Sequence, residues 1–220
     1  MSRYIVCEAE QQTPQWFRDR LGRVTGSKAN CVSAKARTGS GEGVTRANYR
    51  MDLVLERITG LPAAPTFAER EDMQWGNEQE PLSRMAYDIH TGLDIQRSGF
   101  VYLPDVMAGT SVDGFVTDER SRPGFWESKS PKSKNHYAYL LADKVPAEYM
   151  PQVIHGFWVT GCEFCDFQSY DPRMPEKLRV FIKRVERADV LDLINAHEAA
   201  VLQFLAEVDA EEKAMRLLAA

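Results

Sequence analysis

The sequence has no long apolar run. No stretch of its 220 residues comes near the roughly 20 consecutive apolar residues that a transmembrane helix needs. The first apolar residues, Tyr4 to Cys7, are followed at once by Glu8, so the apolar segment of a secretory signal is missing. Internal repeats and low-complexity tracts are also missing. We therefore expect a cytoplasmic protein without membrane contact.

Cysteine is scarce, with four residues in the whole chain. Cys162 and Cys165 form a lone CxxC pair, whereas Cys7 and Cys31 are isolated. A zinc ribbon would need a second pair, and a disulfide framework is typical of small secreted chains. We expect reduced thiols that pack in the interior, with a redox or metal role for the CxxC pair as the alternative.

An overall excess of positive charge is missing as well, since the formal net charge is −5. Proteins that bind nucleic acid usually carry a basic surface. The charge is unevenly distributed, however. The segment 18–50 has eight basic and two acidic residues, whereas the segment from Glu186 to the end has eight acidic and three basic residues. The basic segment is a candidate phosphate-binding surface, and an ordinary solvated face is the alternative.

The content of 44% hydrophobic and 27% charged residues is typical of a globular chain. We expect one domain over 1–220, of the α/β class in its mixed α+β form, with a central mixed sheet flanked by helices. Apolar spacing and turn signals predict helices over 14–21, 46–59, 73–92, 144–160 and 188–218. Period-two runs predict strands over 100–103, 108–116, 124–130, 165–170 and 178–185, the first three as an antiparallel meander.

Two short segments carry the chemistry. Asp113 lies in a tight turn before an apolar run, and Glu127 and Lys129 are two apart in a predicted strand, so their side chains share a face. If the two strands form a hairpin, Asp113 comes alongside Glu127, next to the carbonyl of Ser128. Carboxylate and carbonyl oxygens suit Mg²⁺ or Mn²⁺. A lysine beside them can orient a water molecule, which together would form a phosphodiesterase site.

The pattern Asp113, Glu127-x-Lys129 resembles the motif of the PD-(D/E)xK nuclease superfamily. Its flanks resemble the family of phage lambda exonuclease and the YqaJ-like viral recombinases. The matching blocks, in chain order, are Trp16-x-x-x-Arg20-Leu21-Gly22-x-x-Thr25-x-Ser27, Trp75-Gly76-x-x-x-Glu80, the motif itself, Tyr149-Met150-x-Gln152-Val153-x-x-x-x-Trp158-Val159-Thr160, and Tyr170-Asp171-Pro172-Arg173-Met174. Val112 stands where the motif has its proline, which makes no metal bond.

The resemblance implies a role for each matching residue. Asp113, Glu127, the Ser128 carbonyl and Glu80 would bind catalytic Mg²⁺, as two ions, with Mn²⁺ as a substitute. Lys129 would position the attacking water, and Gln152 would contact the metal site or the nucleophile. The residues implied at the DNA end are Arg20, Thr25 and Ser27, which would hold the 5′-terminal phosphate, and Met73, which would act as an apolar wedge.

The resemblance therefore implies a Mg²⁺-dependent 5′-to-3′ exonuclease that degrades linear double-stranded DNA from 5′-phosphorylated ends to 5′-mononucleotides. The 3′ single strands would serve phage-type recombination. It also implies a homotrimer ring, a single-strand annealing protein as partner, and a phage or prophage origin in a bacterial host. Two alternatives stay open, namely an endonuclease or structure-selective repair nuclease on the same core, and a catalytically inactive DNA-binding module.

Overall fold

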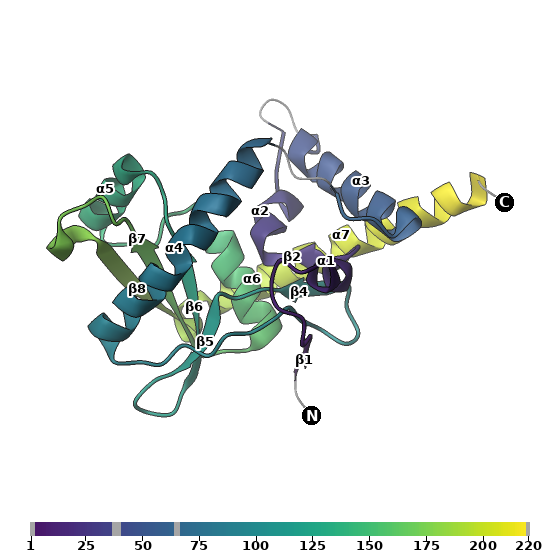
Figure 1. The fold of residues 1–220 in the computed structure, drawn as a ribbon. Coiled ribbons are helices and arrows are strands. Elements are labelled where there is room, and N and C mark those ends of the chain that lie inside the picture. The colour runs from purple at the N-terminus through teal and green to yellow at the C-terminus, as the bar shows by residue number, and fades with distance from the viewer. Residues whose placement is uncertain (1–2, 37–40, 64–66, 219–220) are drawn as a thin grey trace.

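The computed structural model describes residues 3–36, 41–63 and 67–218. Eight strands form two four-stranded mixed sheets, with helices packed around them (Figure 1). The first sheet has the order β1-β3-β4-β2, with β1 antiparallel to β3, β3 antiparallel to β4, and β2 parallel to β4. Its strands are β1 (Ile5–Val6), β2 (Val24–Thr25), β3 (Val101–Tyr102) and β4 (Ala108–Thr110).

The second sheet has the order β5-β6-β7-β8, and its central pair, β6 and β7, is parallel. Its strands are β5 (Gly114–Thr117), β6 (Pro123–Lys129), β7 (Phe164–Tyr170) and β8 (Val180–Glu186). The predicted mixed class is confirmed, but the meander is wrong. The run 108–116 is two strands, because the chain bends at 111–113 and passes from the first sheet to the second. This bend is what brings Asp113 to the sheet edge.

The helices follow the predicted pattern in most places. They are α1 (Pro14–Arg20), α2 (Ala29–Val32), α3 (Val44–Thr59), α4 (Phe67–Thr91), α5 (Ser133–Ala142), α6 (Met150–Thr160) and α7 (Leu191–Leu218), with 3-10 turns η1 (Gly26–Lys28), η2 (Glu176–Leu178) and η3 (Arg187–Val190). Thr13 caps α1 as predicted, since its hydroxyl accepts the Trp16 amide hydrogen at 3.3 Å. The cap and Pro14 at the start fix where α1 begins.

The helix predicted over 144–160 is shorter than expected. α6 begins at Met150, and the segment from Lys144 to Tyr149 lies before it. A separate helix, α5, precedes that segment. Its apolar side chains lie on several sides, with Tyr139 buried but Tyr137 and Leu141 exposed. Because no single apolar stripe marks α5, the sequence periodicity does not reveal it.

The main core lies between the second sheet and α6 and α7. Every residue of α6 from Val153 to Thr160 is buried, and Phe157 packs edge-on against Phe125 of β6 at 5.1 Å between ring centroids. Phe204 of α7 closes the other side of this core against Tyr49 of α3. The rigid layer under β6 therefore consists of large apolar and aromatic side chains, which hold the strand that carries Glu127.

α4 lies across the second sheet (Figure 1) and buries the face opposite to the one that periodicity indicates. The predicted apolar stripe is exposed, with Leu82 at 46%, Met85 at 58% and Ile89 at 80% of the maximal area. Ser83 and Tyr87 are fully buried instead. The prediction of a helix is confirmed, but its contact with the sheet is made by the small polar Ser83 and by Tyr87, whose ring packs against Trp126.

α3 packs along the C-terminal half of α7 (Figure 1). Ion pairs line the seam between the two helices. Arg46 donates to both carboxylate oxygens of Glu207, at 2.7 and 2.8 Å, and Arg50 donates to Glu211 at 2.8 Å. Arg57 pairs with Asp209 at 2.6 Å. The acidic C-terminal segment therefore neutralises Arg46 and Arg50 at the end of the basic segment, which reduces the predicted phosphate-binding surface.

Within the residues that the structure describes, no helix is both long enough and apolar enough to cross a bilayer.

Candidate functional site

The hairpin of β5 and β6 brings the two motif segments together. The last residues of the ladder are Gly114 and Trp126, so Asp113 lies opposite Glu127 one step further. The Ser128 amide donates to Asp113 Oδ2 at 2.7 Å. This bond fixes the Asp113 carboxylate at the end of β6, in the arrangement that hairpin pairing predicts.

Glu127 lies at the centre of the site, with its side chain 2% exposed. Its Oε1 accepts hydrogen bonds from Lys129 Nζ and from Gln152 Nε2 of α6. Burial raises the pKa of Glu127 to about 7, since the nearby Asp113 adds to the effect and Lys129 only partly offsets it. The Glu127 carboxylate is therefore an anion whose charge this chain does not fully compensate.

Asp113 and Lys129 complete the cluster. Burial raises the pKa of Asp113, against the opposing effects of Lys129, the Ser128 amide and Arg84. Burial works to lower the pKa of the Lys129 ammonium, but Glu127 and Asp113 outweigh it, so that pKa lies above its ordinary value. Lys129 is therefore a fixed cation in the site, suited to orienting a water molecule and neutralising charge on a phosphate.

Glu80 approaches from α4 as predicted. Its carboxylate is 3.6 Å from Arg84, one turn along the helix, and Arg84 donates to the carbonyl oxygens of Ile95 and Asp113. Burial raises the pKa of Glu80, and the Asp113 carboxylate adds to that shift. Glu80 thus lies within electrostatic range of Asp113 and makes the site more acidic.

These donors suit a hard cation. No three His, Cys, Asp or Glu side chains in 3–36, 41–63 and 67–218 are arranged as a ready metal-binding group. Mg²⁺ rarely needs one, because it keeps several waters and takes one or two carboxylates together with substrate oxygens. Asp113 and Glu127, whose pKa values are raised because burial leaves their charge undercompensated, fit that requirement together with the Ser128 carbonyl.

A second charged site, of opposite sign, lies at the end of α1. The Arg20 guanidinium lies 4.0 Å from the Trp16 ring centroid and 5.6 Å from that of Phe100, and it donates to Ser111 Oγ at 3.0 Å. Burial lowers the pKa of Arg20 to about 10. Within the described part of the chain, no carboxylate forms an ion pair with Arg20. An arginine held this way is suited to bind an anion.

Of the other predicted phosphate-binding residues, Thr25 ends β2 and Ser27 lies on the turn η1 that follows. Thr25 is buried, and its amide donates to the Tyr49 hydroxyl at 3.1 Å, whereas Ser27 is exposed within η1. A Cβ on Gly26 would lie 2.8 Å from Thr110 Oγ1 and 3.6 Å from Gln152 Cγ. Because Gly26 has no side chain, η1 can lie directly against the part of α6 that carries Gln152.

Met73 lies on α4 with 41% of its area exposed, about two turns before Glu80. Nearby, Trp75 donates to the Ser130 carbonyl at 2.8 Å, and the Arg173 guanidinium lies 5.0 Å from the Trp75 ring centroid. The Trp75 block of the resemblance therefore anchors α4 to the residue that follows Lys129.

Three residues of the site are absent from the predictions. Ser111 accepts hydrogen bonds from Arg20 and, at 3.0 Å, from Trp16 Nε1. Arg84 holds the Asp113 segment, and Gln11 donates to the Val112 carbonyl at 3.0 Å. Gln11 and the burial of Val112 hold the turn where the motif has proline. Their contacts span 29 to 101 positions of sequence, so no local pattern reveals them.

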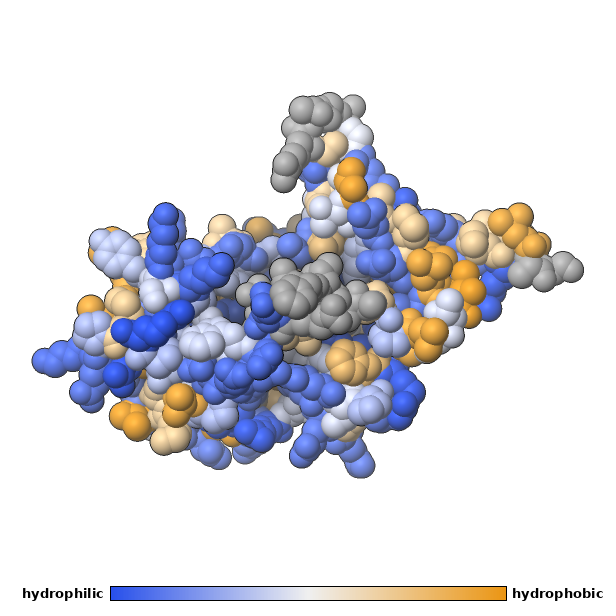
Figure 2. All heavy atoms as spheres, turned by 45° about the horizontal axis from the view of Figure 1, so that its top comes forward, coloured by the Kyte–Doolittle hydropathy of each residue, from blue (hydrophilic) through white to orange (hydrophobic). Residues whose placement is uncertain are grey.

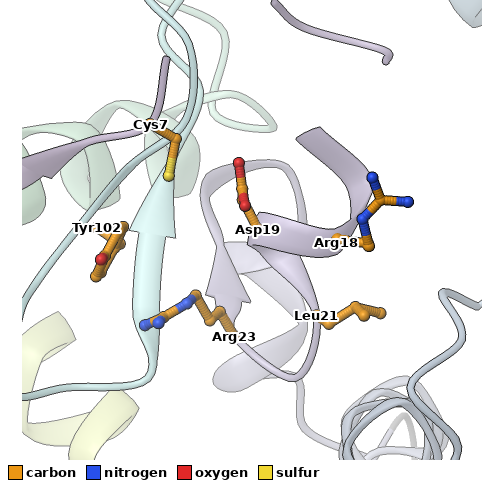
Figure 3. Close-up of a pocket in the computed structure, with 6 residues that line it drawn as sticks. All are labelled: Cys7, Arg18, Asp19, Leu21, Arg23 and Tyr102. Atoms are coloured by element: carbon orange, nitrogen blue, oxygen red, sulfur yellow. The ribbon is translucent and has the colours of Figure 1, made fainter. Parts of the chain in front are cut away.

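A pocket of about 280 Å³ lies beside α1 (Figure 3). Figure 3 shows Cys7 and Asp19 on opposite walls, and the Arg23 guanidinium lies 4.2 Å from the Tyr102 ring centroid. None of the predicted site residues lines this pocket. The candidate site is instead the cluster around Glu127 at the end of β6, together with Arg20, which is hydrogen-bonded to Ser111 in the bend before Asp113.

Cys162 and Cys165 are free and buried, as predicted. Burial raises the pKa of both thiols, so they are protonated near neutral pH. With no metal-binding group among the described residues, the geometry favours packing over the alternative role in redox or zinc chemistry.

The family model for the YqaJ-like viral recombinase domain matches residues 15–163 of this sequence. This range contains both charged sites. The chain belongs to the YqaJ-like viral recombinase domain family. The resemblance inferred from the motif blocks is thereby confirmed.

Solved structures extend the likeness beyond the family model. LHK-Exo, an alkaline exonuclease from Laribacter hongkongensis, is 35% identical, with a TM-score of 0.81 over 94% of this chain and 98% of its own. Its complex with dAMP gives the same values. A phage-related exonuclease from Haemophilus somnus 129PT shares the fold at 12% identity and a TM-score of 0.59, over 86% and 96% of the two chains. A search of curated proteins found no match. These relatives support the prediction of a nuclease.

Proposed function

We propose that this protein is a Mg²⁺-dependent 5′-to-3′ exonuclease that degrades linear double-stranded DNA from 5′-phosphorylated ends and releases 5′-mononucleotides. The observation that carries the proposal is the pair of desolvated sites of opposite sign, the Asp113–Glu127–Lys129 cluster and the buried Arg20 cation, which has no carboxylate ion-pair partner among the described residues. Hydrolysis of DNA needs a cation at the scissile phosphate, and selection of an end needs a site for the terminal phosphate.

Asp113, Glu127 and the Ser128 carbonyl would hold Mg²⁺, with Glu80 as a further acidic group. When bound there, Mg²⁺ would polarise the scissile phosphate and favour ionisation of water. Lys129 Nζ, which Glu127 holds in place, orients the attacking water and neutralises charge that develops on the phosphate. Gln152 donates to Glu127 and keeps its carboxylate turned toward the site.

Arg20 would bind the terminal 5′-phosphate, with Ser111, Thr25 and Ser27 close by. A guanidinium that is desolvated and stacked on Trp16 binds a doubly charged phosphate more strongly than a hydroxyl. With the 5′ end bound at Arg20, the first phosphodiester bond would lie at the Asp113–Glu127–Lys129 cluster. Cleavage would therefore start at the 5′ end and proceed in the 5′-to-3′ direction. Met73 would separate the terminal base pair.

The relatives support the reaction class. LHK-Exo is named an alkaline exonuclease, and its structure with dAMP contains a deoxynucleoside monophosphate, the product class proposed here. The 3′ single strand left by such an enzyme would be handed to a single-strand annealing protein in recombination. A phage or prophage origin in a bacterial host and a cytoplasmic location would go with that role.

A homotrimer ring is also part of the proposal. Figure 2 shows apolar side chains gathered at the end of the molecule formed by α3 and the C-terminal part of α7. Among them are Met51, Leu55, Leu61, Met215 and Leu217, each at least 44% exposed. An apolar patch of this kind at a projecting end is suited to contact with another copy of the chain.

The test is digestion of linear duplex DNA with 5′-phosphate or 5′-hydroxyl ends, beside a closed circle, in Mg²⁺ or EDTA. Mg²⁺-dependent loss of the 5′-phosphorylated linear DNA, with 5′-mononucleotides as product, is the expected result. Cutting of the circle would indicate an endonuclease. DNA binding without any cutting by folded protein would indicate an inactive binding module.

A further inference from the structure

The contact between α4 and the second sheet combines buried hydrogen bonds with packing of the Tyr87 ring on Trp126. Ser83 and Tyr87, one turn apart on α4, are fully buried, whereas the apolar Leu82, Met85 and Ile89 face outward. The Tyr87 hydroxyl donates to Asp166 Oδ2 at 2.7 Å, and Arg184 binds the same carboxylate. A buried polar contact is weak unless its partners are correctly placed, so this seam fixes the position of α4 more strictly than apolar packing would.

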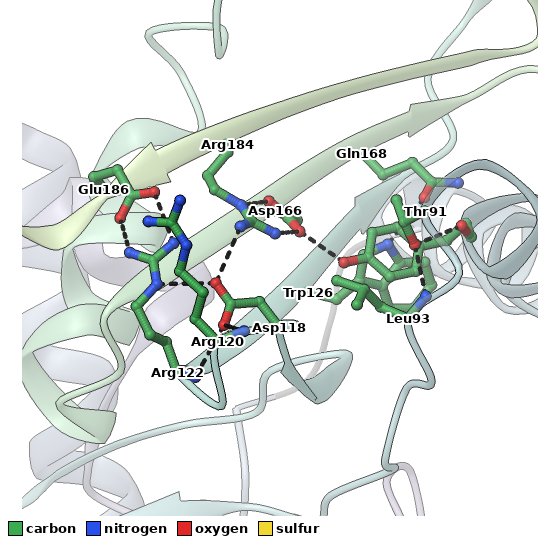
Figure 4. A network of polar contacts seen from close by, with 11 residues as sticks. Thr91, Leu93, Asp118, Arg120, Arg122, Trp126, Asp166, Gln168, Arg184 and Glu186 are labelled. Carbon is green, nitrogen blue, oxygen red and sulfur yellow. Dashed lines mark hydrogen bonds and ion pairs between the residues drawn. The ribbon is translucent and has the colours of Figure 1, made fainter.

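One part of this seam leads directly to the candidate active site. Figure 4 shows Trp126 and Gln168 beside the Asp166 network. Trp126 Nε1 donates to Gln168 Oε1 at 3.0 Å, and Gln168 Nε2 donates to Ser83 Oγ at 2.9 Å and to the Ser83 carbonyl at 2.8 Å. Ser83 Oγ lies 2.6 Å from Ser128 Oγ. A continuous chain of four side chains therefore joins the core of the sheet to Ser128.

The orientation of this chain is set by chemistry. An indole N–H can only donate, so the Gln168 carbonyl must face Trp126 and its amide must face Ser83. Gln168 and Ser83 are both inaccessible to solvent, so water does not compete for these bonds. The Ser83 hydroxyl is thereby held at one position against Ser128.

Ser128 is the residue on which the site depends. Its amide holds Asp113, its carbonyl is a proposed metal ligand, and its neighbours in β6 are Glu127 and Lys129. Ser83 lies three residues after Glu80 on α4, so the same contact sets how far Glu80 reaches toward Asp113. We infer that Ser83 and Gln168 are positioning residues, which hold Ser128 and α4 in the geometry that the metal site requires. This inference rests on the proposed function.

The test compares Ser83→Ala, Gln168→Met and Ser128→Ala with Tyr87→Phe as the matched control. Tyr87→Phe removes a buried hydrogen bond of the same seam one turn further along α4, where Asp166 keeps its bonds to Arg184. For each full-length variant we would measure Mg²⁺ binding without DNA by titration calorimetry, the Mg²⁺ concentration at half-maximal cleavage, and unfolding in urea.

We expect Ser83→Ala, Gln168→Met and Ser128→Ala to weaken Mg²⁺ binding about tenfold, the usual effect of removing a group that orients metal ligands. Because Ser83 acts through Ser128, the double variant Ser83→Ala/Ser128→Ala should bind Mg²⁺ as tightly as either single variant. Tyr87→Phe should lose comparable stability while its Mg²⁺ affinity stays within about twofold of the wild type.

Unchanged Mg²⁺ affinity in Gln168→Met and Ser128→Ala would overturn the inference, even if Ser83→Ala proved unable to fold. An equal loss of affinity in Tyr87→Phe would also overturn it, because general loosening of α4 would then explain the result. A failure of the proposed function is distinguishable, since the wild type itself would then neither bind Mg²⁺ nor cleave DNA.

Discussion

Several charged side chains near β6 and α1 differ from those along the α3–α7 seam in the direction in which their pKa values are shifted. At the seam, the hydrogen bond from Arg46 lowers the pKa of Glu207, and the bond to Glu207 raises the pKa of Arg46. At the candidate sites, Glu127 and Asp113 likewise shift the pKa of Lys129 toward its charged form, but the pKa values of Glu127 and Arg20 shift toward the neutral forms. Burial raises the pKa of Glu127 to about 7 and lowers that of Arg20 to about 10.

The direction of the shift separates charges that are satisfied within the chain from charges that are not. A group shifted toward its charged form has found a partner, whereas a group shifted toward its neutral form has been desolvated without enough compensation. Such groups gather at functional sites, because a ligand supplies the missing charge. The comparison therefore assigns Glu127 to a cation and Arg20 to an anion, and it assigns Arg46 and Glu207 to structure.

The largest effect should come from Lys129→Ala. This change removes the ammonium that neutralises the phosphate, so we expect the cleavage rate to fall about 10²–10³-fold, the typical cost of losing one group that stabilises the transition state. DNA binding should be retained. Cleavage of 5′-phosphorylated linear DNA under single-turnover conditions measures the rate.

Lys183→Ala is the matched control, since Lys183 of β8 forms an exposed ion pair with Asp143, the residue after α5. It should cleave at the wild-type rate. Cleavage by Lys129→Ala at the wild-type rate would show that the Asp113–Glu127–Lys129 cluster does not take part in the reaction.

Arg20→Gln should affect only one kind of DNA end. Losing a charge-assisted bond to phosphate costs about 1.5–3 kcal/mol, so cleavage of 5′-phosphorylated DNA should fall about 10–100-fold. Cleavage from a 5′-hydroxyl end should change little, because that end makes no such bond. Parallel assays of kcat/KM on both ends would check this. Equal losses on both ends would show that Arg20 supports folding and does not select the end.

The raised pKa of Glu127 predicts how stability depends on pH without divalent cations. The folded protein binds the Glu127 proton more tightly than the unfolded chain, whose value is near 4.5. The free energy of unfolding should therefore rise as pH falls from about 7 toward 4.5, by about 2 kcal/mol. Urea unfolding in EDTA across this range measures it.

Glu127→Gln should lack this rise, because the variant has no proton to bind. His155 and His197, whose pKa values burial lowers to about 3 and about 4, act in the opposite direction below pH 6.5. Their effect is common to both proteins, so the difference between wild type and variant isolates Glu127. Parallel curves for the two proteins would contradict the assignment.

The β6 site could be predicted because its contacts are local. Glu127 and Lys129 share a face through the period of two, and the turn to Asp113 is a hairpin of adjacent strands. Gln152 and Glu80 lie on helices that periodicity reveals, but their approach to Glu127 and Asp113 depends on tertiary packing. Only the family resemblance connected them to the site.

The contacts of α4 could not be predicted for a physical reason. Periodicity assumes that the apolar stripe of a helix faces the core, yet Leu82, Met85 and Ile89 are exposed and Ser83 and Tyr87 are buried. The local charge count misled in a similar way, because Arg46 and Arg50 also pair with acidic residues of α7 that lie 157 to 161 positions away. Both errors come from interactions between distant segments.

The smallest effect should come from Arg46→Gln. Arg46 and its partner Glu207 are partly exposed, at 16% and 34%, so the pair contributes at most about 1 kcal/mol to stability. We expect a loss below that value in urea unfolding at low salt, and a smaller loss in 1 M NaCl, because salt screens exposed pairs. Glu207→Gln should behave alike, and cleavage by both variants should match the wild type. If Arg46→Gln weakened DNA binding while Glu207→Gln did not, Arg46 would belong to the DNA surface as well as to the α3–α7 seam.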